Sequence, residues 1–315
     1  MKKWSYRSAA AGAVVWVGLV MAPLHPNYGV GTIEKLFLLA PLVIVPLGLR
    51  LTGPVAPGGR ALLFAIPLVA SFLFPQGWLA ALLAAPWVVF TVWCGLTGLW
   101  RFWKGAYRDP VETCFAAALL FLPVGGMGLA QSRLGMTPLG YGEPVVLLVA
   151  VHFHYAAFVS PIMAGAVLGR MAGGERLKWL VAVSASFGSP ILAAGYTLFV
   201  PAVRLLGATL LVVALFAVAL LTLAELPAVR PRLAQVLLGI SAVSVVAAML
   251  YATAYAVADF FGTVWIAIPH MARTHGYWNA LGFSLCGLAG WSLAGAGQER
   301  PRRSAALQSL TRRWM

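Results

Sequence analysis

The chain has 315 residues, of which 61% are hydrophobic and 10% are charged, and its mean hydropathy is +0.89. These values lie far outside the range of soluble globular domains and exclude a soluble enzyme. The formal net charge of +14 could suggest nucleic-acid binding, but the basic residues fall between apolar segments and argue for membrane topology instead. We therefore expect an integral membrane protein with no nucleic-acid partner.

Apolar segments recur along the whole chain, and segments of about 18 to 25 residues can cross a hydrocarbon core roughly 30 Å thick as helices. The predicted fold class is an all-α, polytopic transmembrane helix bundle that forms a single membrane domain. The first span could instead be a signal peptide, and the third is short. About ten spans are expected, near residues 8–22, 32–50, 61–75, 78–100, 110–131, 144–169, 178–200, 203–224, 233–258 and 275–295.

The basic residues predict the orientation of these spans. Placing the N-terminus in the cytoplasm puts 18 of the 22 Lys and Arg residues on the cytoplasmic side. This asymmetry is what the positive-inside rule expects, so both termini should face the cytoplasm. Residues 296–315 would then form a basic cytoplasmic tail that contacts anionic headgroups. The non-cytoplasmic side keeps Lys35, Arg133, Arg204 and Arg273.

Several polar residues in or near the spans have structural explanations. Asp109 precedes a proline and is placed to cap a helix, and Glu112 is placed to close a capping box. Glu225 precedes two arginines at a span end and is expected to form an interfacial ion pair. Small apolar packing is the expected role of Cys94, Cys114 and Cys286.

The sixth span contains the segment VLLVAVHFHYAAFVSPIMAG, residues 146–165, with three polar side chains in an apolar helix. At about 1.5 Å per residue, His152 and His154 lie roughly 12 and 15 Å from the non-cytoplasmic end. Because residues i and i+2 of a helix point in nearly opposite directions, the two rings should face different neighbours. Tyr155 is expected to orient the ring of His152.

The ninth span ends AMLYATAYAVADFFG, in which Tyr251, Tyr255 and Asp259 share one helix face. An interfacial tyrosine belt, with Asp259 in a loop, is the alternative interpretation. Glu34, in GTIEKLFLLA, enters the second span from the same side. It could serve a site or pair with Lys35 or headgroups.

The tenth span opens with IPHMARTHGYWNALGF. His275 and Asn279 fall on one face of this helix, and Gly276 should allow a neighbouring helix to approach closely. His270 and Arg273 lie just before them and should sit at the mouth of a site. Ionisable groups inside a bilayer are costly, so these residues are functional candidates.

We predict one shared site in the non-cytoplasmic half of the membrane. Its catalytic members would be Asp259, His152, His275, Tyr155 and Asn279. Its substrate-binding members would be His154, Tyr255, Glu34, Arg273 and His270.

The same stretches resemble a known family. VHFHYAAFVSPIMAG and MARTHGYWNALGF, with VETCFAAALLFLPVGGMGLAQSRLG upstream, look like the YndJ-like family of bacterial membrane proteins over roughly residues 110–295. The resemblance implies a multi-pass protein of the bacterial inner membrane. It also implies that the motif positions are His152, His154, Tyr155, His275, Gly276 and Asn279. The family is poorly characterised, and some members are labelled transporters.

Three functions fit these residues. The first is an intramembrane enzyme of the isomerase or cyclase type, in which Asp259 is the acid acting on an apolar isoprenoid- or lipid-like substrate. The second is a transporter of a small solute with a proton-relay site. The third is a protein that binds haem or a divalent metal through His152, His154 and His275, although the motifs predict no cofactor. Membrane lipids and an apolar small molecule are the expected partners.

Overall fold

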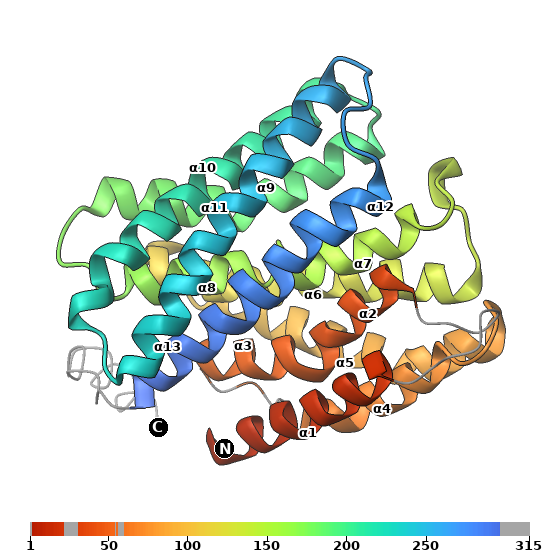
Figure 1. Cartoon of the computed structure of the whole chain (residues 1–315), viewed down its shortest axis with the longest axis horizontal. Helices are drawn as coiled ribbons and strands as arrows, with labels where there is room; N and C mark the ends of the chain where they lie inside the picture. The colour runs from red at the N-terminus through yellow and green to blue at the C-terminus, as the bar shows by residue number, and fades with distance from the viewer. Residues whose placement is uncertain (1, 22–30, 54, 56–59, 297–315) are drawn as a thin grey trace.

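The structure, a computed structural model, describes residues 2–21, 31–53, 55 and 60–296. All regular secondary structure in these ranges is helical, and the helices form an elongated bundle (Figure 1), so the all-α prediction is confirmed. The uninterrupted helices of 20 residues or more are α1 (Lys2–Met21), α5 (Trp78–Trp103), α6 (Pro110–Leu134), α9 (Glu175–Thr197), α10 (Pro201–Glu225) and α11 (Arg232–Phe260).

The other helical segments are shorter or contain π-helical turns, which are rare and often mark functional sites. Near the N-terminus they are α2 (Thr32–Leu39), the π-helical η1 (Ala40–Ile44), α3 (Val45–Leu51) and α4 (Ala61–Ser71). Mid-chain they are α7 (Val145–Tyr155) and α8 (Val159–Leu168), with 3-10 turns η3 (Ala106–Arg108), η4 (Pro138–Gly140) and η5 (Leu226–Ala228). The final helix comprises α12 (Ile268–Met271), the π-helical η6 (Ala272–Gly276) and η7 (Trp278–Cys286), and α13 (Gly287–Ala296).

Within the described ranges, seven helices are long and apolar enough to cross a membrane, which agrees with a multi-pass membrane protein. They are Thr32–Leu51, Trp78–Trp103, Pro110–Leu134, Val145–Leu168, Glu175–Thr197, Pro201–Ala228 and Arg232–Phe260. The other predicted spans, 8–22, 61–75 and 275–295, overlap α1, α4 and the final helix, but α4 has only 11 residues. The count of ten spans therefore stays a prediction, and the predicted tail beyond residue 296 lies outside the described residues.

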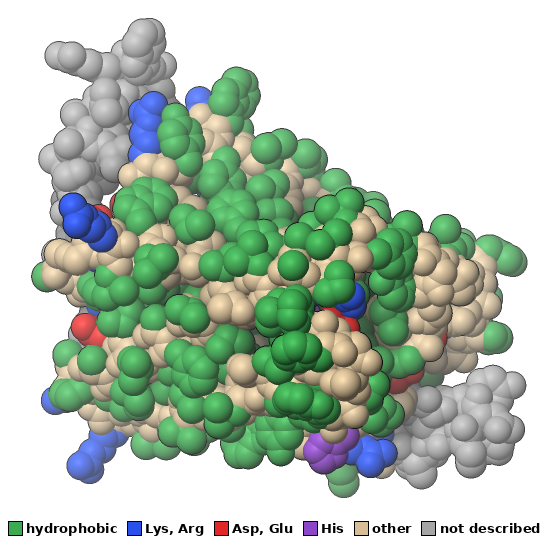
Figure 2. Space-filling model, turned by 90° about the horizontal axis from the view of Figure 1, so that it is seen from above, with side chains coloured by type: hydrophobic (Ala, Val, Ile, Leu, Met, Phe, Trp, Pro, Cys, Tyr) green, Lys and Arg blue, Asp and Glu red, His purple; other side chains and the backbone are tan. Residues whose placement is uncertain are grey.

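Charged side chains divide between the two ends of the bundle. At the end where α1 begins and α13 ends (Figure 1), Arg101 donates to the Thr52 carbonyl and Arg170 pairs with Glu225 at 2.8 Å. Glu225 thus forms the expected ion pair, but with Arg170 rather than with the arginines that follow it. Figure 2 shows a mainly hydrophobic face, on which Lys and Arg side chains are more frequent near the end where α1 begins and α13 ends. We call this end the basic end. The opposite end is where α2, α10 and the final helix begin and α6 ends, and it holds Lys35, Arg133, Arg204 and Arg273. A cleft opens there, so we call it the cleft end.

The two ends of α6 are fixed by polar side chains. Asp109 accepts two backbone N–H bonds, at 2.8 and 3.0 Å, so the predicted cap is confirmed. At the other end the buried Arg133 donates to the carbonyl oxygens of Ser71 and Phe74, at 3.1 and 2.9 Å. These bonds satisfy carbonyls at the end of the short α4, where intrahelical donors run out.

The sixth predicted span, 144–169, corresponds to the membrane-crossing helix Val145–Leu168, which contains a local irregularity. Its first part, α7, ends at Tyr155 and its second part, α8, begins at Val159, with a turn at residues 156–158 between them. In this turn the Ala157 N–H reaches back five residues to the His152 carbonyl, at 3.1 Å. The interruption directly follows the three polar residues of α7.

Candidate functional site

His154 is fully buried between α7, α5 and α2. The Trp87 indole donates a hydrogen bond to its Nε2 at 3.0 Å, and its Nδ1–H donates to the Ala150 carbonyl at 2.8 Å. The ring also packs edge-on against Phe37. Because protein groups occupy both ring nitrogens, this arrangement favours a packing role over the predicted substrate-binding role.

His152 faces a different side of α7 from His154, as predicted. Its side chain is exposed, and its Nδ1–H donates to the Leu148 carbonyl at 2.8 Å. Its ring lies near enough to His275 of the final helix for an electrostatic interaction between the two. Within the described part of the chain, Nε2 of His152 has no hydrogen-bond partner.

Tyr155 contacts α2 instead of orienting His152, the role that the sequence suggested. Its hydroxyl donates to the Leu36 carbonyl in α2 at 2.7 Å, and its side chain is buried. That carbonyl is available because the Ala40 N–H, at the start of the π-helical turn, bonds to Phe37 instead. Tyr155 therefore fixes α7 against α2.

His275 lies in η6, and its Nδ1–H donates to the Ala248 carbonyl of α11 at 2.9 Å. The Asn279 amide nitrogen is 3.3 Å from Nδ1, 3.2 Å from Nε2 and 3.0 Å from the His275 carbonyl oxygen. An atom almost equidistant from both ring nitrogens cannot lie along the lone pair of either, so the amide covers the ring face and donates to the carbonyl. Among the described residues, Nε2 of His275 has a polar contact only with Asn279, and that amide lies off the ring plane.

Gly276 allows the final helix to approach α2, as predicted. A Cβ atom at Gly276 would lie 2.9 Å from Cδ1 of Leu36, closer than packed carbon atoms come. The same Leu36 supplies the carbonyl that binds Tyr155. Leu36 thus links α2 to both stretches of sequence that carry the histidines.

Asp259, in the last turn of α11, forms an ion pair with Arg204 of α10, at 2.9 Å between Oδ1 and Nη1. The two side chains are only 24% and 19% exposed, and the Arg204 guanidinium lies over the Tyr196 ring. The sequence analysis missed Arg204 as a partner. A signal was present, because Arg204 starts one helix and Asp259 ends the next, and consecutive antiparallel helices bring such positions together.

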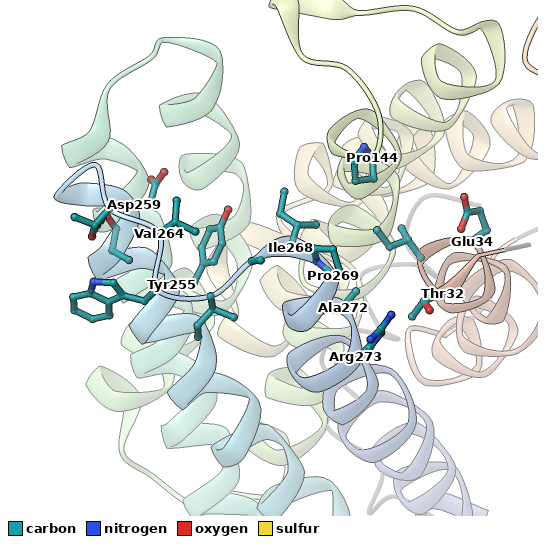
Figure 3. A pocket seen from close by; sticks show the side chains of 16 residues that line it. Thr32, Glu34, Pro144, Tyr255, Asp259, Val264, Ile268, Pro269, Ala272 and Arg273 are labelled. Carbon is teal, nitrogen blue, oxygen red and sulfur yellow. Dashed lines mark hydrogen bonds between the residues drawn. The ribbon is translucent and has the colours of Figure 1, made fainter.

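A cleft of about 610 Å³ opens at the cleft end, and its lining is mainly apolar. The lining comes from the start of α2, the residue before α7, the end of α11, residues 263–269 and residues 272–273. In Figure 3, Tyr255 and Asp259 stand on the α11 side, and Arg273 extends toward Thr32. Glu34 lies on the opposite, α2 side. The cleft therefore offers charged groups at its margins and an apolar interior.

The structure divides the residues of the predicted shared site between the cleft and the adjacent part of the final helix. Four of its members line the cleft: Glu34, Tyr255, Asp259 and Arg273. His275 and Asn279 follow Arg273 on the same helix, with His152 nearby. His270 is exposed at the start of the final helix, with its ring 6.2 Å from that of Tyr251, and does not line the cleft.

The comparison with known families agrees with the sequence motifs. The family described as YndJ-like protein matches residues 35–283. The chain belongs to the YndJ-like family. Because the match starts at residue 35, the family likeness extends over N-terminal spans that the motif resemblance did not cover.

One curated relative of this YndJ-like chain is the uncharacterized membrane protein YndJ of Bacillus subtilis (strain 168). The two are 27% identical over 210 residues, which cover 67% of this chain and 38% of the relative. The aligned part is thus well under half of that protein. No solved structure gives a significant match.

The YndJ-like chain offers a limited set of metal ligands. Among the described residues, no group of three or more His, Cys, Asp and Glu side chains is placed to hold a metal ion. His154 cannot join His152 and His275 as a ligand without losing the Trp87 bond or the Ala150 bond. Binding of haem or a divalent metal through these histidines stays a prediction.

Proposed function

We propose that this protein is an intramembrane enzyme that transfers protons to and from a lipid-like substrate, with His275 as the principal catalytic residue. The observation that supports the proposal is the anchored ring of His275. Its Nδ1–H is bound to Ala248, which fixes the tautomer and leaves the lone pair of Nε2 to accept a proton. The ring sits in a π-helical turn two residues from Arg273, which lines the cleft.

The neighbouring residues suit the other roles of such a reaction. Asn279 covers one face of the His275 ring, and His152 supplies a second imidazole whose Nδ1 is also anchored. In an isomerisation or cyclisation, one ring removes a proton from the substrate while the other, when protonated, delivers one elsewhere. Tyr255 would hold the polar end of the substrate, and the apolar lining would hold the rest.

Asp259 takes a positioning role in this proposal. Its carboxylate oxygen Oδ1 is bound to the Arg204 guanidinium, so this bond would have to break before Oδ1 could contact a substrate. The pair instead holds the end of α11 against α10, and so shapes one wall of the cleft. Proton transfer is therefore assigned to the histidines.

The cleft also bears on the transporter hypothesis. A transporter that works by alternating access opens to one side of the membrane at a time, so a cleft lined only from the cleft end fits a transporter as well as an enzyme. The anchored ring of His275 is the observation that favours the enzyme.

Solvent deuterium incorporation tests the proposal even when the substrate is unidentified. Vesicles that contain the protein and lipids of its native membrane are incubated in D₂O, and the lipids are analysed by mass spectrometry for carbon-bound deuterium. We expect label in one lipid class with the wild type and none with His275→Ala. Tyr251→Phe is the matched control, because Tyr251 packs near His270 outside the cleft. If no label depends on His275, proton transfer to carbon is rejected.

A further inference from the structure

A second cavity lies on the surface between α11 and the final helix. This groove has a volume of about 540 Å³ and is lined mainly by apolar and aromatic side chains. Trp278 in its wall is 45% exposed. The final helix contributes Arg273, Tyr277, Trp278, Leu281 and Cys286 to the lining.

Arg273 lies where the groove meets the cleft, because it lines both. Its side chain is exposed and forms no hydrogen bond or ion pair with any described residue. Asp259, in the same cleft, is already paired with Arg204, and no ion pair joins Arg273 to Glu34, which lies on α2 beyond Thr32 in Figure 3. A cation at the level of the bilayer is costly without a counter-ion, so Arg273 is complementary to an anion supplied from the membrane.

The order of residues along the groove matches the order of groups in a phospholipid. Arg273 and the aromatic Tyr277 and Trp278 come first, and Leu281 and Cys286 follow further along the helix. In a phospholipid the phosphate is likewise followed by the interfacial glycerol and then by the acyl chain. Arginine binds phosphate oxygens through two parallel N–H donors, and tyrosine and tryptophan favour the membrane interface.

We infer that this groove binds an anionic phospholipid, with its phosphate on Arg273 and one acyl chain along Trp278 and Leu281 toward Cys286. The groove is a lipid-binding site separate from His275, and its occupancy requires no catalysis. Because Arg273 also lines the cleft, the bound lipid covers the membrane side of the cleft at this point. An anionic headgroup is favoured over a zwitterionic one, since the groove lining includes no carboxylate that could pair with an ammonium group.

Lipid retention measures this site directly. The purified protein is given equal amounts of phosphatidylglycerol and phosphatidylcholine with the same acyl chains, and the retained lipid is quantified by native mass spectrometry. The wild type should retain more phosphatidylglycerol. Arg273→Gln should lower that retention about tenfold, the effect of losing one charge-assisted hydrogen bond, and Arg273→Lys should lower it less. Arg232→Gln removes the same charge at the basic end and should leave retention unchanged.

A photo-crosslinking residue in place of Trp278 locates the bound lipid. We expect adducts with phospholipid that decrease when Arg273→Gln is added, while the elution volume in size-exclusion chromatography stays the same. Equal retention of both lipids by the wild type, or no effect of Arg273→Gln, would overturn the inference. Adducts with residues 22–30 or with a second copy of the chain would also overturn it, because protein would then fill the groove.

Discussion

Trp87 of α5 donates a hydrogen bond of 3.0 Å to Nε2 of His154 in α7, and neither side chain is exposed. An indole N–H can only donate, so Nε2 must be the acceptor. The ring proton of His154 therefore resides on Nδ1, which donates to Ala150. This bond ties α5 to α7, and neither residue lines the cleft.

We expect Trp87→Phe to destabilise the fold and to leave the chemistry intact. The variant leaves Nε2 of His154 buried without a donor, at a cost of about 1–3 kcal/mol. Thermal unfolding in detergent should show a lower midpoint, while deuterium incorporation per folded molecule stays unchanged. A loss of incorporation at an unchanged midpoint would instead return His154 to the reacting site.

His275→Ala should lower the activity and leave the stability nearly unchanged, the opposite of Trp87→Phe. Removal of a general acid or base lowers rates by about 100- to 10,000-fold, whereas the bond to the Ala248 carbonyl is worth only about 1 kcal/mol. Deuterium incorporation should therefore fall far more than the unfolding midpoint. His270→Ala is the matched control, because that ring is exposed and lies outside the cleft lining. Equal effects of the two variants would contradict the role of His275.

The sequence predicted the features that depend on residues close together in the chain. Hydropathy located the helices, and the Asp109 cap and the opposite orientations of His152 and His154 followed from local geometry. Contacts between helices did not follow. Trp87 is 67 residues from His154, and Leu36 is 119 residues from Tyr155. Helical periodicity states which way a side chain points, but it does not state which helix lies there.

Interruptions of the helices were also hidden from the pattern. The turn at residues 156–158 contains no proline or glycine, and hydropathy runs through it without a change. Around His275 the sequence pattern predicts ordinary α-helix, whereas the structure has π-helical turns. In both places contacts with other helices, such as those of Tyr155 with Leu36 and His275 with Ala248, accompany the irregular backbone. The pattern of one helix taken alone does not contain these contacts. The irregular backbone around Tyr155 and His275 could therefore not be predicted.

A double-mutant cycle on Arg204 and Asp259 tests the positioning role. Arg204→Gln leaves a mostly buried carboxylate without its partner and should cost about 1–3 kcal/mol, since both groups retain some exposure. Adding Asp259→Asn should recover part of that loss and part of the deuterium incorporation. If Asp259 were the proton donor, every variant with Asp259→Asn would be inactive, whatever residue stands at 204.

Cysteine labelling tests the predicted topology at α4, which is short for a membrane-crossing helix. Gln76 lies just after α4, and its Nε2 is 3.4 Å from Oε1 of Glu143, so both residues belong to the cleft end. The positive-inside rule places that end outside the cytoplasm. In a variant whose three native cysteines are replaced by alanine, a membrane-impermeant maleimide should label Gln76→Cys and Glu143→Cys in cells with an intact inner membrane. Lys104→Cys, at the basic end of α5, should react only after permeabilisation. Reaction at 143 without reaction at 76 would mean that α4 does not cross the membrane, and the reverse pattern for all three sites would invert the orientation.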